Sequence, residues 1–253
     1  MSAENVIVVR GLTKVFHGTP VLQQLDLDVS RGETLVILGR SGTGKSVLLK
    51  HLNALLRPDA GTIRFGDVDV TRTTEADLVP VRRRIGMLFQ GGALFDSLTI
   101  ADNVAFALDE HAVCKGDERA RRVAELLALV GLSGTESRMP SELSGGMRKR
   151  VALARTLALE PEVLLYDEPT TGLDPVTGRQ INMLIRDLQR RFGLTSIVVT
   201  HDLASAFYVA DRIAFLADGR IRKISTVREM SRSEDPEIRT FLTAGALEAG
   251  GQA

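Results

Sequence analysis

Short apolar runs and amphipathic stretches alternate along most of the chain. Val6 to Val9, the alternating positions from Val21 to Val29, and Thr34 to Leu38 predict strands near the start. Val163 to Tyr166 and Thr195 to Thr200 predict further short strands that are apolar enough to be buried on both faces. Strands that alternate with helices favour a parallel sheet, whose ligand lies beyond the carboxyl ends of the strands.

Between these strands, apolar residues recur at helical spacing. From about residue 92 to 160 the pattern is helical throughout, and the α/β alternation then resumes. Arg212 to Arg222 predicts a hairpin that turns at Asp218-Gly219, a favoured two-residue turn. The expected helices span Lys45 to Leu56, Ile100 to Leu108, Glu118 to Val130, Arg148 to Leu159 and Gly178 to Phe192. The pattern therefore predicts an α/β core that is interrupted by a helical insert.

Charge and cysteine content exclude several kinds of protein. The 253 residues include 32 Lys plus Arg and 32 Asp plus Glu, so we expect no nucleic-acid partner, which is usually bound through a basic excess. The basic runs Arg82 to Arg84 and Arg148 to Arg150 are expected on solvated faces. The single cysteine, Cys114, predicts neither a disulfide nor a metal site. Without a signal-peptide pattern or a run of 18 apolar residues, we expect a cytosolic chain that acts on membranes only through partners.

A glycine-rich segment follows the predicted strand Thr34 to Leu38 and fits the phosphate-binding pattern G-x-x-x-x-G-K-[ST]. Its residues are Gly39, Arg40, Ser41, Gly42, Thr43, Gly44, Lys45 and Ser46, with Val47 next on the following helix. Glycines let backbone N–H groups surround phosphate oxygens, and the helix N-terminus favours negative charge. Lys45 is expected at the β- and γ-phosphates of ATP and the Ser46 hydroxyl at Mg²⁺. We expect the whole segment, including Val47, to bind the nucleotide.

Two acids, Asp167 and Glu168, directly follow the predicted strand Val163 to Tyr166. The end of a buried strand lies at the ligand edge of the sheet, so both carboxylates are expected near the nucleotide. Asp167 suits the shell of Mg²⁺, and Glu168 suits a general base that polarises the attacking water. His201 ends the next predicted strand at the same edge, where we expect it to contact the γ-phosphate and help to hold that water.

The segment Leu143 to Met147, with the sequence LSGGM, precedes another predicted helix. Together with the phosphate loop, the acidic strand end and His201, it resembles the signature motif of the ABC ATPases. The resemblance covers about residues 5 to 230, with every motif in the family order. It implies a P-loop NTPase fold of the ABC ATPase type, with an N-terminal antiparallel β subdomain and an inserted helical subdomain.

The resemblance also implies the domain organisation. A single ABC ATPase domain is expected over residues 1–245, followed by a loose tail at 244–253 that is rich in Gly and Ala. Within the domain we expect a RecA-like core at about 1–91 and 160–225, a helical subdomain at about 92–159 and C-terminal helices at 226–243.

Further site residues follow from the resemblance. Phe16 looks like the aromatic that stacks on adenine, and Gln90 like the Q-loop glutamine that senses Mg²⁺ and the catalytic water. Asp174 looks like the D-loop residue that couples two sites. The implied catalytic residues are Glu168, His201 and Gln90, and the implied Mg²⁺ residues are Ser46, Gln90 and Asp167.

The signature motif implies that two copies of the chain work together. In the family, residues at the positions of Ser144, Gly145 and Gly146 contact the γ-phosphate held by a second copy. A helix N-terminus with small residues is again suited to an anion. The resemblance therefore implies a homodimer that encloses two ATP molecules and separates after hydrolysis.

Met147 stands where the family usually has Gln. Met at this position, the stretch Leu88 to Val104 and the stretch Asp235 to Leu242 resemble the branch of Mla/Mce-type phospholipid transporters. That branch implies an integral membrane permease, a Mce-type lipid-binding protein and, in some members, a STAS-like regulator. It would place this chain on the cytoplasmic face of a bacterial inner membrane. The phospholipid cargo follows from this resemblance alone.

Three alternatives stay open. An importer of an amino acid, a metal complex or another small solute would share the mechanism. A soluble ABC ATPase of DNA repair, translation or cluster assembly is disfavoured by the single domain and by the lack of sustained heptads. A regulatory binder that has lost hydrolysis is disfavoured because Glu168 and His201 are both present.

Overall fold

The computed structural model describes residues 4–250. Its main sheet has six strands in the order β10-β9-β3-β8-β7-β6, all parallel except β10, which runs antiparallel to β9. These strands are β3 (Thr34–Leu38), β6 (Ile85–Leu88), β7 (Val163–Asp167), β8 (Thr195–Thr200), β9 (Arg212–Ala217) and β10 (Arg220–Thr226). The predicted parallel sheet is confirmed.

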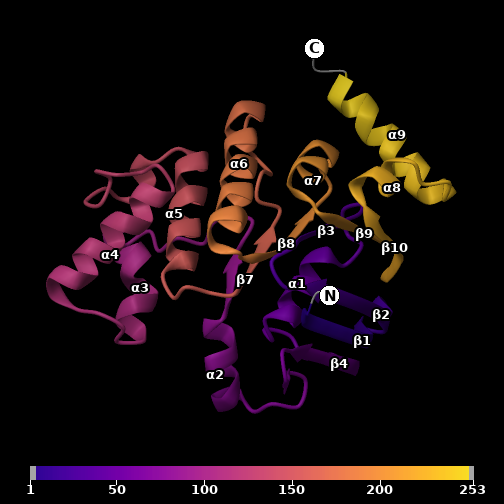
Figure 1. Ribbon diagram of the computed structural model, residues 1–253, viewed down its shortest axis with the longest axis horizontal. Coiled ribbons are helices and arrows are strands. Elements are labelled where there is room, and N and C mark those ends of the chain that lie inside the picture. The colour runs from indigo at the N-terminus through magenta and orange to yellow at the C-terminus, as the bar shows by residue number, and fades with distance from the viewer. Residues whose placement is uncertain (1–3, 251–253) are drawn as a thin grey trace.

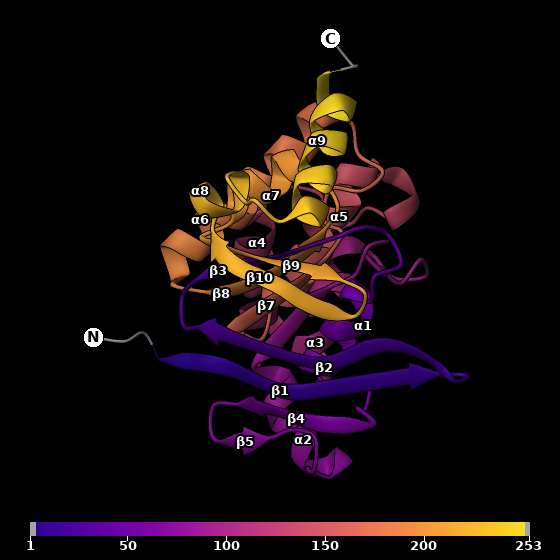
Figure 2. The ribbon, with the colours of Figure 1, turned by 90° about the vertical axis from the view of Figure 1, so that its right-hand side faces the viewer.

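A second, antiparallel sheet has the order β2-β1-β4-β5. Its strands are β1 (Asn5–Phe16), β2 (Thr19–Ser30), β4 (Ala60–Phe65) and β5 (Val68–Asp69). Figure 2 shows it as a separate layer below the main sheet, with most of the helices on the opposite side. This is the N-terminal antiparallel β subdomain that the sequence predicts.

Nine α-helices and one short 3₁₀ helix (Pro140–Glu142) occur in residues 4–250. The α-helices are α1 (Lys45–Leu52), α2 (Glu75–Arg83), α3 (Ile100–Glu110), α4 (Gly116–Leu129), α5 (Gly145–Leu157), α6 (Pro175–Phe192), α7 (Leu203–Val209), α8 (Val227–Ser231) and α9 (Pro236–Gly250). Helices α3, α4 and α5 gather at one side of the molecule (Figure 1), which confirms the helical insert. Within the described residues, no helix has both the length and the apolar character needed to cross a membrane.

Alternate residues of the buried strands pack into two hydrophobic cores. In β3, Val36 and Leu38 face the core that the helical insert shares with α6 and α7. Leu35 and Ile37 face the opposite core, which contains α1 and the antiparallel sheet. The main sheet is thus covered on both faces, and only its strand ends remain for a ligand.

Strand register brings the carboxyl ends of the central strands to one level. Leu38 pairs with Thr200, Asp167 pairs with Val199, and Leu88 pairs with Tyr166. The segments that follow β3, β6, β7 and β8 therefore leave the sheet side by side. We call this edge the nucleotide edge.

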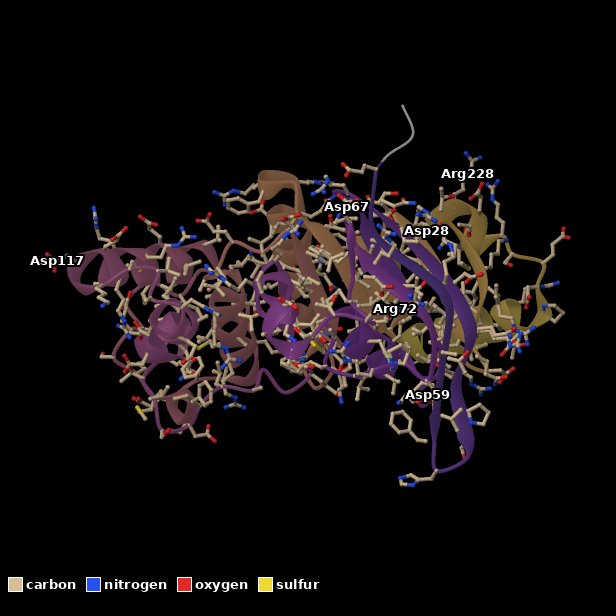
Figure 3. All side chains as sticks on the ribbon, turned by 90° about the horizontal axis from the view of Figure 1, so that it is seen from below. Asp28, Asp59, Asp67, Arg72, Asp117 and Arg228 are labelled. Carbon is tan, nitrogen blue, oxygen red and sulfur yellow. The ribbon has the colours of Figure 1, made fainter. Side chains whose placement is uncertain are left out.

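The molecule is elongated along the line from the helical insert to the C-terminal helices. Figure 3 shows Asp117, at the start of α4, at one end and Arg228, on α8, towards the other. The nucleotide edge lies on the central strands between them.

Several predicted element ends differ from the structure. Helix α1 stops at Leu52, because Ala54 has the left-handed φ of 56° and the Asn53 side chain accepts a hydrogen bond from Leu55 N. The loose tail expected at 244–253 is instead helical as far as Gly250, while residues 251–253 lie outside the described residues. The hairpin turn at Asp218-Gly219 is confirmed, with φ of 48° and 71°.

Candidate functional site

The phosphate loop joins β3 to α1 and is shaped by its glycines. A Cβ atom on Gly39 would lie 2.3 Å from the carbonyl oxygen of Leu216, so no larger residue fits there. Gly42 and Gly44 have φ of 82° and 98°, which L-residues rarely adopt. Gly44 is also the N-cap of α1 and supplies no side-chain acceptor. The first N–H groups of α1 therefore have no side-chain cap. A helix N-terminus of this kind favours an anion.

The other loop residues surround this helix end. Arg40 and Ser41 are exposed, and Thr43 Oγ1 donates to the Arg40 carbonyl at 2.9 Å. Val47, on the first turn of α1, packs against the core beneath the loop.

Lys45 is buried beneath the loop, with 6% of its surface exposed. Its Nζ donates to the carbonyl oxygens of Gly39 and Arg40, both at 2.9 Å, and lies 3.8 Å from Glu168 Oε1. Burial lowers the pKa of Lys45, and the nearby carboxylates oppose that shift. The ammonium is therefore held inside the loop, within reach of a ligand that replaces these carbonyl partners.

Ser46 and Asp167 come together from opposite sides of the site. Ser46 Oγ donates to Asp167 Oδ1 at 2.7 Å, joining the start of α1 to the end of β7. Asp167 is 7% exposed. A hydroxyl and a carboxylate side by side are oxygen ligands of the kind that Mg²⁺ prefers.

Three side chains at the nucleotide edge contact the carboxylate of Glu168. His201 Nδ1 lies 3.0 Å from Oε1, while Thr171 Oγ1 and Thr200 Oγ1 donate to Oε2 at 3.1 and 3.3 Å. Its backbone N–H donates to Val199 O at 3.0 Å. Glu168 has the left-handed φ of 48°, which costs a non-glycine residue about 1–2 kcal/mol. The surrounding bonds fix both its backbone and its carboxylate.

His201 itself is half exposed, with 48% of its side chain accessible. Because Nδ1 of His201 contacts the Glu168 carboxylate, the other ring nitrogen, Nε2, can form a hydrogen bond with a ligand in the exposed part of the site.

Helix α5 places the LSGG segment beside the start of α6. Ser144 caps α5 by accepting from Met147 N at 3.3 Å. A Cβ on Gly146 would lie 2.3 Å from Thr177 Cγ2, so this glycine permits the close contact with α6. Asp174 caps α6 by accepting from the N–H groups of Val176 and Thr177. Hydrogen bonding from Thr177, first from its side chain and then from its N–H, lowers the pKa of Asp174.

Gln90 and Phe16 lie at the margins of the edge. Gln90 is exposed two residues beyond the end of β6, which is the strand next to β7. Phe16 ends β1 and is partly exposed, with Lys14 Nζ 5.3 Å from its ring centroid. The β1–β2 hairpin lies against the phosphate loop, since a Cβ on Gly44 would be 3.1 Å from Val21 O.

Lys149 is a site residue that sequence reasoning missed. The basic run Arg148 to Arg150 was expected on a solvated face, but Lys149 is only 6% exposed. Its Nζ donates to the carbonyl oxygens of Glu168, Pro169 and Thr171. The helical period gives the signal in hindsight, because Lys149 lies three residues after the buried Gly146 and shares its face of α5.

Comparisons with known proteins agree with this geometry. Residues 22–171 match the family model described as "ABC transporter". The chain is 42% identical over 236 residues to the "Probable ribonucleotide transport ATP-binding protein mkl" of Mycobacterium leprae, which covers 93% of this chain and 68% of the relative. It is 42% identical to the "Methionine import ATP-binding protein MetN" of Rhizobium etli, covering 96% of this chain and 67% of the relative. This chain thus spans about two thirds of the length of both relatives.

A third relative is aligned over most of its own length. The "Intermembrane phospholipid transport system ATP-binding protein MlaF" of Haemophilus influenzae is 40% identical, covering 94% of this chain and 90% of the relative. Among solved structures, two dimeric structures of the cassette MJ0796, one of them a post-hydrolysis state bound to ADP and Pi, each superpose with a TM-score of 0.81. Their sequence identity is 33%, over 88% of this chain and 99% of the other.

Proposed function

This chain belongs to the ABC transporter family, and on that premise we propose that it is the ATP-hydrolysing motor of a phospholipid transporter. ATP hydrolysis is the activity common to the family, and the predicted ABC ATPase fold is confirmed by the MJ0796 cassettes. The observation that supports hydrolysis most directly is Glu168, a carboxylate fixed by His201 beside the phosphate loop.

The chain's residues fit Mg²⁺-ATP. Gly39 and Gly44 keep the loop clear of side chains, the uncapped α1 N-terminus suits phosphate oxygens, and Lys45 adds a charge at the same place. Ser46 and Asp167 would hold Mg²⁺, together with Gln90 from the segment that follows β6. Mg²⁺, when bound, would neutralise charge that develops on the β- and γ-phosphates. Phe16 would stack on the adenine ring.

Glu168 would act as the base for the attacking water. An ionised carboxylate accepts a proton from the water as the water oxygen bonds to the γ-phosphorus, and the bond from that phosphorus to the β–γ bridging oxygen breaks to release ADP. The hydroxyls of Thr171 and Thr200 orient Oε2, and His201 orients Oε1. The Nε2 of His201 would contact the γ-phosphate and hold it in line with the water.

A second copy of the chain would complete each site. The MJ0796 cassettes are dimers, and one is bound to ADP and Pi. Ser144, Gly145 and Gly146 lie at the N-terminus of α5, where they would meet the γ-phosphate held by the other copy. Asp174, at the adjacent N-terminus of α6, would lie between the two sites.

An aromatic pair on the helical insert would dock an integral permease. Phe95 and Phe106 are 41% and 42% exposed, and their ring centroids are 4.6 Å apart. The buried Asn103 bonds both backbone groups of Phe95, which holds the pair at the surface. Exposed aromatic residues of this kind are typical of interfaces. The chain would then lie peripherally on the cytoplasmic face of a bacterial inner membrane.

The phospholipid cargo is supported by the relative named MlaF and by two cues in the sequence. Met147 replaces the usual Gln, and the segment after Gln90 resembles the same branch. A Mce-type lipid-binding protein and a STAS-like regulator are the further partners that this branch would bring. The relatives named MetN and Mkl favour a small-solute transporter as the second candidate.

Co-purification from native membranes tests this proposal. A tagged Glu168→Gln chain is extracted in mild detergent, and the recovered proteins and lipids are identified by mass spectrometry. We expect a multi-span permease, a Mce-type protein and tightly held phospholipid. Adding Phe95→Asp should lower the recovery of permease without lowering ATP binding. A permease with a different solute-binding protein and no lipid would keep the motor and reject the cargo. Soluble partners alone would reject the transporter.

A further inference from the structure

Lys149 is a buried ammonium whose partners are backbone carbonyl groups. Its Nζ lies 2.8 Å from Pro169 O, 2.8 Å from Thr171 O and 3.3 Å from Glu168 O. In the described part of the chain, no carboxylate oxygen lies within salt-bridge distance of this ammonium. Removing an ammonium from water is unfavourable unless its donors are satisfied, so three converging acceptors are the compensation here.

The three carbonyls belong to one turn that contains the proposed base. Glu168 adopts a left-handed φ of 48°, and Pro169 follows it directly. An L-residue does not stay in that region unless its surroundings hold it there. A single ammonium donates to the carbonyl oxygens of residues 168, 169 and 171 and so stabilises the conformation of this turn. The contact therefore acts on the position of the Glu168 carboxylate.

The same ammonium belongs to the helix that begins with the LSGG segment. Lys149 lies three residues after Gly146, on the first turns of α5. Gly145 and Gly146 lie against Leu173 and Thr177, at the end of the segment that also contains Glu168. Helix α5 thus contacts the segment from Glu168 to Thr177 near both ends of that segment. Lys149 provides the charged contact, at the Glu168 end.

Arg150, the next residue on α5, shows that the contact is specific to Lys149. Its guanidinium donates to Gln180 Oε1 on α6 and is partly exposed. Both residues add one positive charge to the same turn of α5, but only Lys149 contacts the carbonyls of residues 168–171. Arg150 is therefore a matched control.

We propose that Lys149 is a positioning residue, which holds the Glu168 turn to the helix whose N-terminus meets the nucleotide of the second copy. A displacement of α5 on engaging that nucleotide would move the base of the chain's own site through Lys149. Each site would then hydrolyse ATP only when its chain also engages the opposite site. This inference rests on the proposed function, in which two copies enclose ATP.

Lys149→Met tests the inference, because Met keeps most of the length and the apolar character of the side chain but removes all donors. In the otherwise native chain, we expect kcat for ATP hydrolysis to fall at least tenfold, with KM changed less than about threefold. In the Glu168→Gln background, Lys149→Met should change the residual turnover less than about threefold, since the base is already absent. ATP-dependent dimerisation of that double variant, followed by light scattering, should equal that of Glu168→Gln alone. Arg150→Met should leave kcat within about twofold.

Two results with Lys149→Met would overturn the inference. One is a kcat for Lys149→Met equal to that of Arg150→Met. The other is loss of ATP-dependent dimerisation, which would make Lys149 a support of the signature segment instead. If Lys149→Met does not fold, Lys149→Gln and Lys149→Arg replace it, since both keep donors. They should then give intermediate values of kcat, and native values for both would also overturn the inference. Native turnover by Glu168→Gln itself would instead reject the proposed function.

Discussion

The Nδ1 atom of His201 lies 3.0 Å from Oε1 of Glu168, so the residue after β8 fixes the residue after β7. Parallel pairing of these strands places the two side chains next to each other at their carboxyl ends. Because the imidazole binds one carboxylate oxygen and two threonine hydroxyls bind the other, the protein's own side chains orient the base.

Replacing His201 tests this orientation. In His201→Ala, we expect kcat for ATP hydrolysis to fall at least tenfold, because a misplaced base and phosphate lose part of the roughly 10²–10⁴-fold effect of general base catalysis. ATP affinity should stay within about threefold, since the phosphate loop is untouched. Steady-state turnover and calorimetric titration measure the two quantities. His111→Ala, remote at the end of α3, is the control, and equal turnover in both variants would contradict a role for His201.

Lys45 is expected to supply binding energy to the nucleotide. Its ammonium now donates to Gly39 O and Arg40 O, and phosphate oxygens would take over as acceptors. A hydrogen bond between charged groups contributes about 1.5–3 kcal/mol, so Lys45→Ala should weaken ATP binding roughly tenfold or more. Titration calorimetry with Lys50→Ala, an exposed lysine on the same helix, provides the comparison. Unchanged affinity in Lys45→Ala would show that the loop is not the phosphate site.

Phe16→Ala tests the adenine contact at the end of β1. Stacking of an aromatic side chain on a base contributes about 1–3 kcal/mol, and the ATP affinity of the variant should fall accordingly. Val15→Ala, at an exposed position of the same strand, should leave the affinity unchanged. Fluorescent-nucleotide titration of the two variants is sufficient. Equal affinities would mean that Phe16 only packs against Lys14.

The pH dependence of turnover reports on Lys149. Burial lowers its pKa from 10.5 to about 8, with the charge of Glu168 opposing the shift. The titratable groups next to the Glu168 carboxylate are Lys45, whose Nζ lies 3.8 Å from Oε1, and His201, whose Nδ1 lies 3.0 Å from the same atom. Below about pH 8 the ammonium keeps its full set of donors, and as pH rises through 8 it loses a proton. Turnover should therefore decline on the alkaline side.

Lys149→Arg separates this effect from other titrations. A guanidinium stays protonated at every accessible pH, so the alkaline decline should move to higher pH or disappear. A pH profile of kcat from 6 to 10, with Arg150→Met in parallel, makes the measurement. Identical alkaline limbs in the native chain and in Lys149→Arg would assign the decline to another group.

The parts of the site that lie at strand ends could be predicted from the sequence. Short apolar strands end at Leu38, Asp167 and Thr200. Parallel pairing places the residues that follow these strands at one edge of the sheet. Lys149 could not be predicted, because its contact with the Glu168 turn depends on how α5 packs against residues 168–177. Its spacing from Gly146 indicates which face of α5 it shares, but not which segment that face packs against.

Some secondary-structure elements could also not be predicted from the local sequence pattern. Strand β6 (Ile85–Leu88) has only four residues, of which Gly86 is one, and it forms because β7 offers a parallel partner. Strand β4 (Ala60–Phe65) depends likewise on pairing with β1, far back in the chain. The end of α1 depends on the left-handed conformation of Ala54, which no sequence rule assigns to alanine.

The central claim is that two copies enclose ATP and that Glu168 starts its hydrolysis. Light scattering of Glu168→Gln with Mg²⁺-ATP tests it most directly, with turnover measured on the same sample. We predict a stable dimer that retains ATP, turnover reduced by about 10²-fold or more, and monomer when ATP is replaced by ADP. A chain that binds ATP but stays monomeric, or that hydrolyses ATP at the native rate, would contradict the claim.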